Sequence, residues 1–182
     1  MATKRLLTAR NRMTRAAEVL FVLGLLATPA GAIDTPNERI TLVGLTGVHV
    51  VFDEIGEEGD RQGVTRARLQ PEVERGLRRA GLRVLMASEA LTSVGRPTLH
   101  LRVSVLRVQE VADFYVYSID LALRQHVRLV RDRAVESYAT TWSDSRVVGA
   151  ARADQLGVVR NALLTKVDEF VAAWRVSNQE RY

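Results

Sequence analysis

The chain has 182 residues, of which 47% are hydrophobic and 26% are charged, and it contains no cysteine. This length and composition fit one folded domain with a short additional segment, and they exclude the collagen-like, disordered and disulfide-stabilised classes. Without cysteine, the sequence also excludes thiolate metal sites, thiol nucleophiles, redox-active cysteine pairs and lipid attachment through a cysteine.

The first 32 residues carry the three parts of a secretory signal peptide. Five basic residues come first, an apolar run of nine residues follows over 19–27, and small residues lie at Ala30 and Ala32. This pattern predicts cleavage after Ala32 and a periplasmic or secreted mature chain. The alternative is an uncleaved membrane anchor, but the run is shorter than the roughly 20 apolar residues that span a bilayer. Contact with a membrane is expected only if this segment is retained.

The positive charge of the chain is concentrated in the predicted signal peptide. The whole chain has 26 basic and 21 acidic residues, and residues 1–32 hold 5 of the basic and 1 of the acidic ones. The remaining 21 basic and 20 acidic residues leave the mature chain almost neutral. Nucleic acid is therefore not an expected partner. Lys166 is the only lysine after residue 32.

The mature chain is predicted to be a polar leader over 33–39 and a single domain over 40–182. A strand is expected over 48–55, where apolar residues cluster. The next segment, 56–63, has three glycines and three acidic residues and predicts a loop.

A helix is expected to begin after Thr65, which can cap its first turn, and to end at Gly81. Its apolar positions are spaced four, four and three residues apart, at Leu69, Val73, Leu77 and Ala80. Pro71 lies inside this span, so either the first turn is distorted or the regular helix begins at Pro71. A short strand over 82–86 follows.

Strict alternation of apolar and polar residues predicts half-buried strands over 99–105 and 115–129, and a further strand over 135–143. A single apolar stripe predicts a closing helix over 152–176. The alternation favours antiparallel pairing. We therefore predict an α+β fold: a mainly antiparallel sheet of about five strands in β-α-β-β-β-α order, with two helices packed on one face.

Three segments carry a resemblance to known proteins: LTGVHVVFDEI (45–55), LRRAGLRVL (77–85) and VDEFVAAW (167–174). They look like an uncharacterised family of exported bacterial proteins. The order of elements resembles the small envelope α+β domains of TolB (its N-terminal domain), the curli secretion factor CsgG and the lipopolysaccharide-assembly lipoprotein LptE. The resemblance implies an envelope location and no catalytic residue. The chain departs from LptE in lacking a cysteine for lipidation.

The sequence offers little catalytic chemistry. It has no G-x-S-x-G, H-E-x-x-H, G-x-x-x-x-G-K-[ST], G-x-G-x-x-G or S-x-x-K motif. The three histidines, His49, His100 and His126, lie in different predicted strands and would have to converge with a carboxylate to bind zinc. The acidic residues over 53–60 do not follow the EF-hand spacing. A metal-dependent hydrolase is therefore the least favoured function, and no metal or cofactor is expected.

The polar face of the predicted sheet is the candidate interaction surface. Its members are charged or titratable residues of the alternating strands: Arg102, Asp120, Arg124, His126 and Arg128. We predict a non-catalytic periplasmic envelope protein that binds a partner, such as another envelope protein, through this face or a sheet edge. The alternative is a carrier that holds a lipid or other apolar small ligand between helices and sheet.

Overall fold

The computed structural model describes residues 36–53 and 55–179. The predicted signal peptide over 1–32, its cleavage after Ala32 and the start of the predicted leader lie outside the described residues. The chain divides into two units, Met1–Gly31 and Ala32–Tyr182. The fold described below is that of the second unit alone.

The strands of the described residues form one mixed sheet of six strands. They are β1 (Gly47–Phe52), β2 (Arg83–Val84), β3 (Thr98–Arg107), β4 (Phe114–Arg128), β5 (Glu136–Ser143) and β6 (Val147–Arg152). The order is β2-β1-β3-β4-β5, and β6 pairs with β4. β1 is parallel to both β2 and β3, whereas β4 is antiparallel to β3, β5 and β6.

The α+β class is confirmed, but the prediction of a mainly antiparallel sheet in β-α-β-β-β-α order is wrong. The chain leaves β1 through α3 (Glu57–Arg61) and α4 (Arg66–Arg79), and it leaves β2 through α5 (Ala87–Thr92). Each crossover returns the chain to the same end of the sheet, so the joined strands run parallel. Alternation of buried and partly exposed side chains along β1 and β3 indicates that one face of the sheet is open. It carries no information on whether neighbouring strands are parallel or antiparallel.

The helix predicted after Thr65 is confirmed as α4. The Thr65 side chain accepts a hydrogen bond from the Arg68 N–H at 3.4 Å, which satisfies one donor of the first turn. Pro71 lies within the helix and is exposed. Gly81 follows the C-cap with φ of +93°, a conformation that glycine adopts without strain.

β4 pairs with β3 along one edge, and two strands share its other edge. β5 pairs with residues 122–128, and β6 pairs with residues 114–119. The chain passes from β5 to β6 through Asp144, Ser145 and Arg146. β6 was not predicted.

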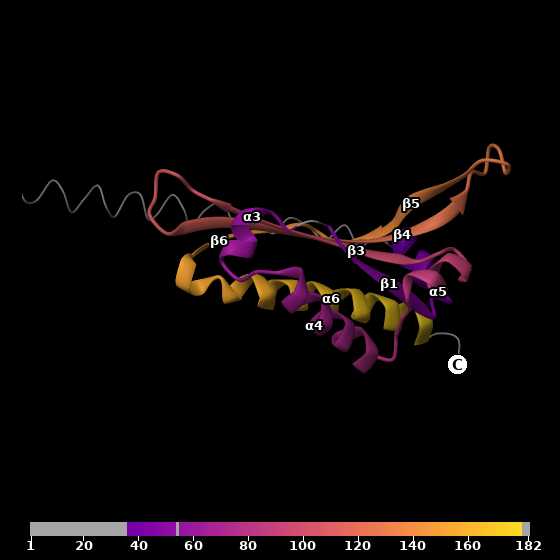
Figure 1. Ribbon diagram of the computed structural model, residues 1–182. Coiled ribbons are helices and arrows are strands. Elements are labelled where there is room, and N and C mark those ends of the chain that lie inside the picture. Colours follow the sequence, from indigo (N-terminus) through magenta and orange to yellow (C-terminus); the bar gives the residue numbers. More distant parts are fainter. Residues whose placement is uncertain (1–35, 54, 180–182) are drawn as a thin grey trace, which may run out of the picture. The chain divides into compact units, whose positions relative to one another are not determined.

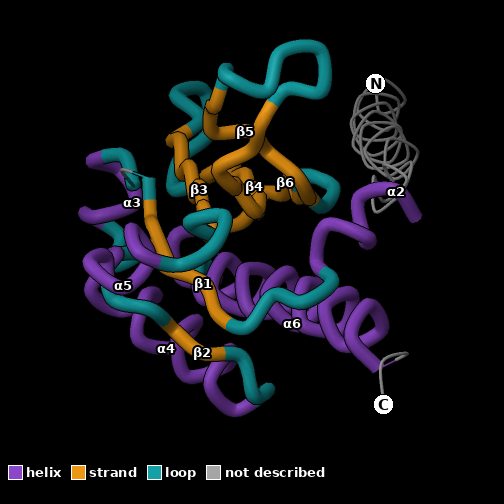
Figure 2. The backbone as a smooth tube through the Cα atoms, turned by 90° about the vertical axis from the view of Figure 1, so that its right-hand side faces the viewer, coloured by secondary structure: helices purple, strands orange, loops and turns teal. Residues whose placement is uncertain are grey.

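The core lies between the sheet and the helices α4 and α6 (Gly157–Gln179), which lie side by side on one face (Figures 1 and 2). These are the two helices expected there. α6 corresponds to the helix predicted over 152–176, but it begins at Gly157 because β6 and a 3-10 turn occupy residues 147–155. The inward side chains of the central strands, Leu99, Leu101, Val103, Ile119 and Leu123, are fully buried. Within the described residues, no helix is long and apolar enough to cross a bilayer.

Part of the expected leader is structured. The helical turn α2 (Pro36–Arg39) continues into the 3-10 helix η1 (Ile40–Leu42). The Ser177 hydroxyl of α6 donates a hydrogen bond to the Arg39 carbonyl at 3.0 Å, and the Asn178 amide donates one to the Leu42 carbonyl at 3.0 Å. These contacts attach the segment to the end of α6.

Candidate functional site

The face of the sheet opposite α4 and α6 carries the polar side chains of β1, β3 and β4. Strand register sets Arg102 opposite Asp120, and Thr98 opposite Arg124. Further along β4, His126 lies opposite Tyr138 and Arg128 lies opposite Glu136.

An open pocket of about 370 Å³ lies on this polar face. Its lining residues come from β1, β3, β4, β5 and the β5–β6 connection: Asp53, His100, Arg102, Asp120, Ala122, Arg124, Thr140 and Arg146. Three of the five residues predicted for the interaction face, Arg102, Asp120 and Arg124, are thus brought together. Asp53 and Arg146 were not predicted because they reach the pocket from distant parts of the sequence.

Two of the three arginines in the pocket are paired with carboxylates. The Arg102 Nε donates to Asp53 Oδ2 at 3.0 Å, and the Arg146 Nε donates to Asp120 Oδ1 at 2.7 Å. Arg124 is exposed, and its guanidinium has no hydrogen-bond or ion-pair partner among the described residues. The pocket therefore holds one positive charge in excess of its two carboxylates.

His100 lies on the wall of this pocket, and its surroundings favour the neutral imidazole. Its burial lowers the pKa below the ordinary value of 6.5, and the nearby Arg124 guanidinium lowers it further, against the opposing attraction of Asp53. The His100 Nδ1 lies 3.6 Å from Asp53 Oδ1. A bound anion would offset the repulsion from Arg124 and would raise the pKa of His100.

His126 and Arg128, the other two predicted residues, do not line the pocket. Both contact Glu136 on β5: the Arg128 Nε donates to one carboxylate oxygen at 2.6 Å, and the His126 Nε2 lies 3.6 Å from the other. The His126 ring also packs edge-on against Tyr138, with 5.3 Å between ring centroids. The predicted face therefore separates into a pocket and a hairpin cluster.

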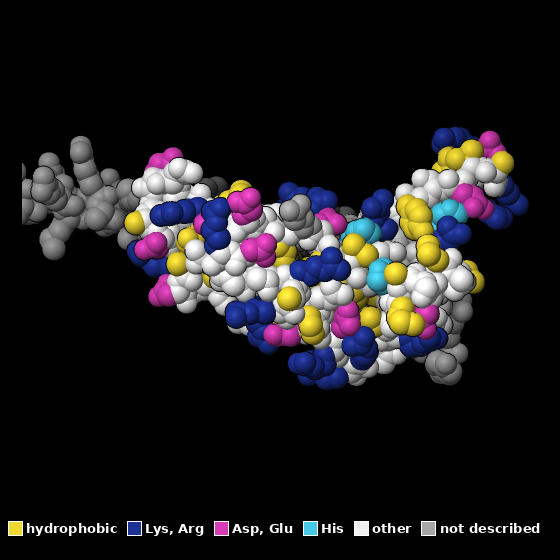
Figure 3. All heavy atoms as spheres, viewed as in Figure 1, with side chains coloured by type: hydrophobic (Ala, Val, Ile, Leu, Met, Phe, Trp, Pro, Cys, Tyr) yellow, Lys and Arg dark blue, Asp and Glu magenta, His cyan; other side chains and the backbone are white. Residues whose placement is uncertain are grey.

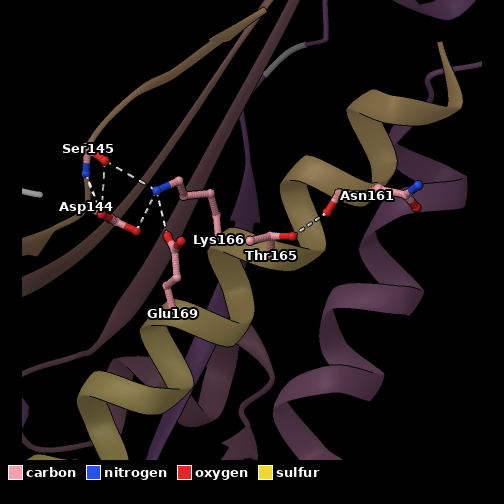
Figure 4. Close-up of polar contacts among 6 residues, drawn as sticks. All are labelled: Asp144, Ser145, Asn161, Thr165, Lys166 and Glu169. Carbon is pink, nitrogen blue, oxygen red and sulfur yellow. Dashed lines mark hydrogen bonds and ion pairs between the residues drawn. The ribbon is translucent and has the colours of Figure 1, made fainter. Parts of the chain in front are cut away.

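A buried charged cluster lies on the helix side of the sheet (Figure 4). Lys166 on α6 is 6% exposed. Its Nζ donates to Asp144 Oδ2 at 2.9 Å and to Glu169 Oε2 at 2.6 Å, and it lies 3.4 Å from Ser145 Oγ. The cluster therefore attaches the β5–β6 connection to α6, two residues before Arg146 enters the pocket on the opposite face.

The electrostatics of this cluster favour a structural role. Burial opposes the charge on Lys166, but the hydrogen bonds to Glu169 and Asp144 outweigh it and raise its pKa above 10.5. Burial also opposes ionisation of Asp144, yet hydrogen bonds involving Glu169, Lys166 and the Ser145 N–H lower its pKa below 3.8. Lys166 is thus held as a cation, so it supplies no general base for Ser145.

The three histidines have separate surroundings. The His49 Nδ1 lies 3.0 Å from the Leu85 carbonyl oxygen, whereas His100 contacts Asp53 and His126 contacts Glu136. The described residues contain no group of three or more His, Cys, Asp or Glu side chains that could hold a metal ion. Nothing in these contacts favours the hydrolase hypothesis.

Comparisons with known proteins show a likeness to solved structures and no match to a known family. No protein-family model matches the sequence, and no curated protein is significantly similar to it. A solved structure that is similar is a dodecamer of a PelC variant from Paraburkholderia phytofirmans, with a TM-score of 0.42 and 20% identity. The match covers 71% of this chain and 92% of that chain. The resemblance to exported bacterial proteins stays a prediction, and function has to be inferred from this chain's own residues.

Proposed function

We propose that the domain is a non-catalytic binding module of the cell envelope, and that it binds a carboxylate- or phosphate-bearing ligand in the pocket on the open face of its sheet. The observation that carries the proposal is the unpaired Arg124 guanidinium in a pocket that already orders Arg102 and Arg146. A planar guanidinium offers paired donors that match a carboxylate or a phosphate.

The arrangement of the pocket suits binding more than chemistry. Asp53 and Asp120 fix the two neighbouring arginines, which lowers the entropy that an incoming anion must remove. Neutral His100 and Thr140 add hydrogen-bonding groups without adding negative charge.

The carrier alternative finds no support in the packing. It needs space between the helices and the sheet, and that space is filled by large side chains such as Trp142, Phe170 and Leu163, each at most 1% exposed. A lipid chain would have to displace this core.

The proposal is tested by titrating the purified protein with oligogalacturonate, a polycarboxylate, and with inorganic phosphate, while NMR follows the backbone amides of β3 and β4. We expect saturable shifts around the pocket with one of these probes. Replacing the unpaired guanidinium (Arg124→Ala) should weaken binding by roughly tenfold or more, because it removes a charge-assisted hydrogen bond. The matched control is Arg79→Ala, an exposed arginine at the end of α4.

The pH dependence gives a second measurement. Because a bound anion raises the pKa of His100, binding takes up a proton and should tighten as the pH falls through and below 6.5. His100→Gln should remove this dependence. Equal weakening in the Arg79 and Arg124 variants, or shifts spread over the whole surface, would reject the pocket.

The envelope location has a separate test. Protein recovered from the periplasm of its host should have the intact mass of a chain that begins at Ile33.

A further inference from the structure

The β4–β5 hairpin extends past the rest of the sheet, on the side away from α4 and α6 (Figure 1). β3 pairs with β4 as far as Arg124, and β6 pairs with its other end, over 114–119. A register irregularity between Leu123 and Arg124 bends the strand at this point. Beyond it, β5 is the only strand among the described residues that pairs with β4, and the tip over 129–135 projects past the sheet.

The tip is a hydrogen-bonded turn with exposed apolar side chains. The Asp132 carboxylate accepts a hydrogen bond from the Ala134 N–H at 3.0 Å, and the Val135 N–H donates to the Asp132 carbonyl at 3.1 Å. These bonds leave Val130 96% exposed and Val135 43% exposed. Figure 3 shows apolar and basic side chains together at this tip.

Most charged side chains at the tip are arginines, and two of them are free to contact a binding partner. Arg128 is neutralised by Glu136. Arg131 and Arg133 are exposed, and neither has an ion-pair partner among the described residues. They flank the Asp132 turn, directly after Val130.

A second loop at the same end repeats this composition. The loop over 93–97 contains Val94, which is completely exposed, and Arg96, which is also exposed. Its Gly95 carbonyl accepts a hydrogen bond from the His126 N–H at 2.7 Å, so the loop is attached to the base of the hairpin. Tyr138, 42% exposed, lies on β5 opposite His126.

We propose that this end of the domain, formed by the loop over 93–97 and the hairpin tip over 129–135, docks on an anionic lipid bilayer. The valines would enter the interfacial region, the arginines would contact lipid phosphates, and Tyr138 would lie at headgroup level. An exposed valine alone needs no explanation, but two at one end, each followed within two residues by an arginine, combine the two forces that bind surfaces to anionic membranes. A second copy of the same tip is disfavoured because like charges would oppose each other.

The cysteine-free sequence allows a direct test. A single label site is made by Val130→Cys and coupled to an NBD fluorophore, whose emission rises and shifts to the blue on leaving water. The matched control is Val111→Cys, which is 46% exposed in the loop at the opposite end of β4. The protein is used as purified from its host, so that every variant has the same N-terminus.

With vesicles of phosphatidylcholine and phosphatidylglycerol, we expect the label at position 130 to respond and the label at position 111 not to respond. Vesicles of phosphatidylcholine alone should give little response because the arginines lose their partner. No response at position 130, or equal responses at both positions, would overturn the proposal.

Charge reversal at the tip distinguishes the effect of the tip arginines from the effect of the net charge of the protein. Arg131→Glu with Arg133→Glu should raise the lipid concentration at half-response by at least tenfold, since each basic residue near an anionic surface contributes about fivefold to binding. Arg79→Glu with Arg107→Glu changes the net charge equally, away from the tip, and should leave the response largely intact. Equal losses in the two double variants would contradict docking through the tip. The pocket at Arg124 is unchanged in all of these variants, so this test stands apart from that of the proposed function.

Discussion

The ammonium group of Lys166 lies in a buried site and is stabilised there by Asp144 and Glu169. Removing it by Lys166→Met leaves two carboxylates close together without their cation. Because breaking a buried charge pair leaves an uncompensated charge, we expect a loss of about 3–5 kcal/mol in the free energy of unfolding, measured by urea denaturation.

Arg160 gives the matched control on the same helix. It pairs with Glu72 of α4, but its side chain is half exposed, so Arg160→Ala should lower the free energy of unfolding far less than Lys166→Met does. Similar losses of unfolding free energy in the two variants would show that the buried position of Lys166 does not make its ion pairs more important for stability.

The sign of the pH dependence follows from the raised pKa of Lys166. The folded state holds this proton more tightly than the unfolded state, so the contribution to stability is complete below pH 10.5 and is lost as the pH rises through the higher folded value. In Lys166→Met this part of the alkaline loss should disappear.

Single residues also show how far the sequence could predict the site. Alternation along β3 and β4 correctly put Arg102, Asp120 and Arg124 on one face, because a strand has a period of two. Asp53 and Arg146 were not found, since their partners lie 49 and 26 residues away and only the sheet order brings them together. Lys166 did leave a signal: it is a lone lysine between the apolar positions Leu163 and Val167.

Among the elements, β6 is the strand that the sequence did not reveal. Its centre is Gly149 and Ala150, which have low strand propensity, and Val148 is exposed. Its place is set by the partner strand, where Tyr117 lies opposite Gly149. The parallel pairing of β1 was missed for a related reason: the direction of a neighbouring strand depends on the crossover and leaves no local mark.

The close approach of Gly149 to Tyr117 predicts a strong side-chain preference in β6. A Cβ atom at position 149 would clash with the Tyr117 ring. Because that ring is only 8% exposed and has little room to move, Gly149→Ala should lower the free energy of unfolding by about 1–3 kcal/mol. Thermal unfolding followed by far-UV circular dichroism measures the change.

Gly157→Ala is the control, because an added Cβ there meets open space at the start of α6. It should be neutral or should stabilise the domain by up to about 1 kcal/mol, since alanine is the better helix former. Destabilisation by both substitutions would mean that loss of glycine flexibility, and not contact with Tyr117, is the cause.

In the domain as a whole, the buried core and the proposed binding pocket lie on opposite faces of one sheet. A single buried cluster joins the parallel half, the antiparallel half and both long helices. The pocket around Arg124 lies outside this cluster. Substitutions in the pocket should therefore change ligand affinity with little effect on folding.

One shared core also predicts one cooperative unfolding transition. The two tryptophans of the chain both report the contact of α6 with the rest of the domain. Trp142 packs against Phe170 with 5.1 Å between ring centroids, and the Trp174 Nε1 donates to the Leu45 carbonyl at 2.8 Å. Tryptophan fluorescence and far-UV circular dichroism should therefore give the same urea midpoint.

Phe170→Ala tests this coupling between α6 and the sheet. Phe170 is fully buried, so its truncation should cost about 3–5 kcal/mol and should move both transitions by the same amount. If the fluorescence transition moved alone, α6 would separate from the sheet before the strands unfold, and the two halves of the domain would not share one cooperative core. Coincident transitions would mean that the helices which cover one face also determine the stability of the open face, including the positions of Arg102 and Arg146.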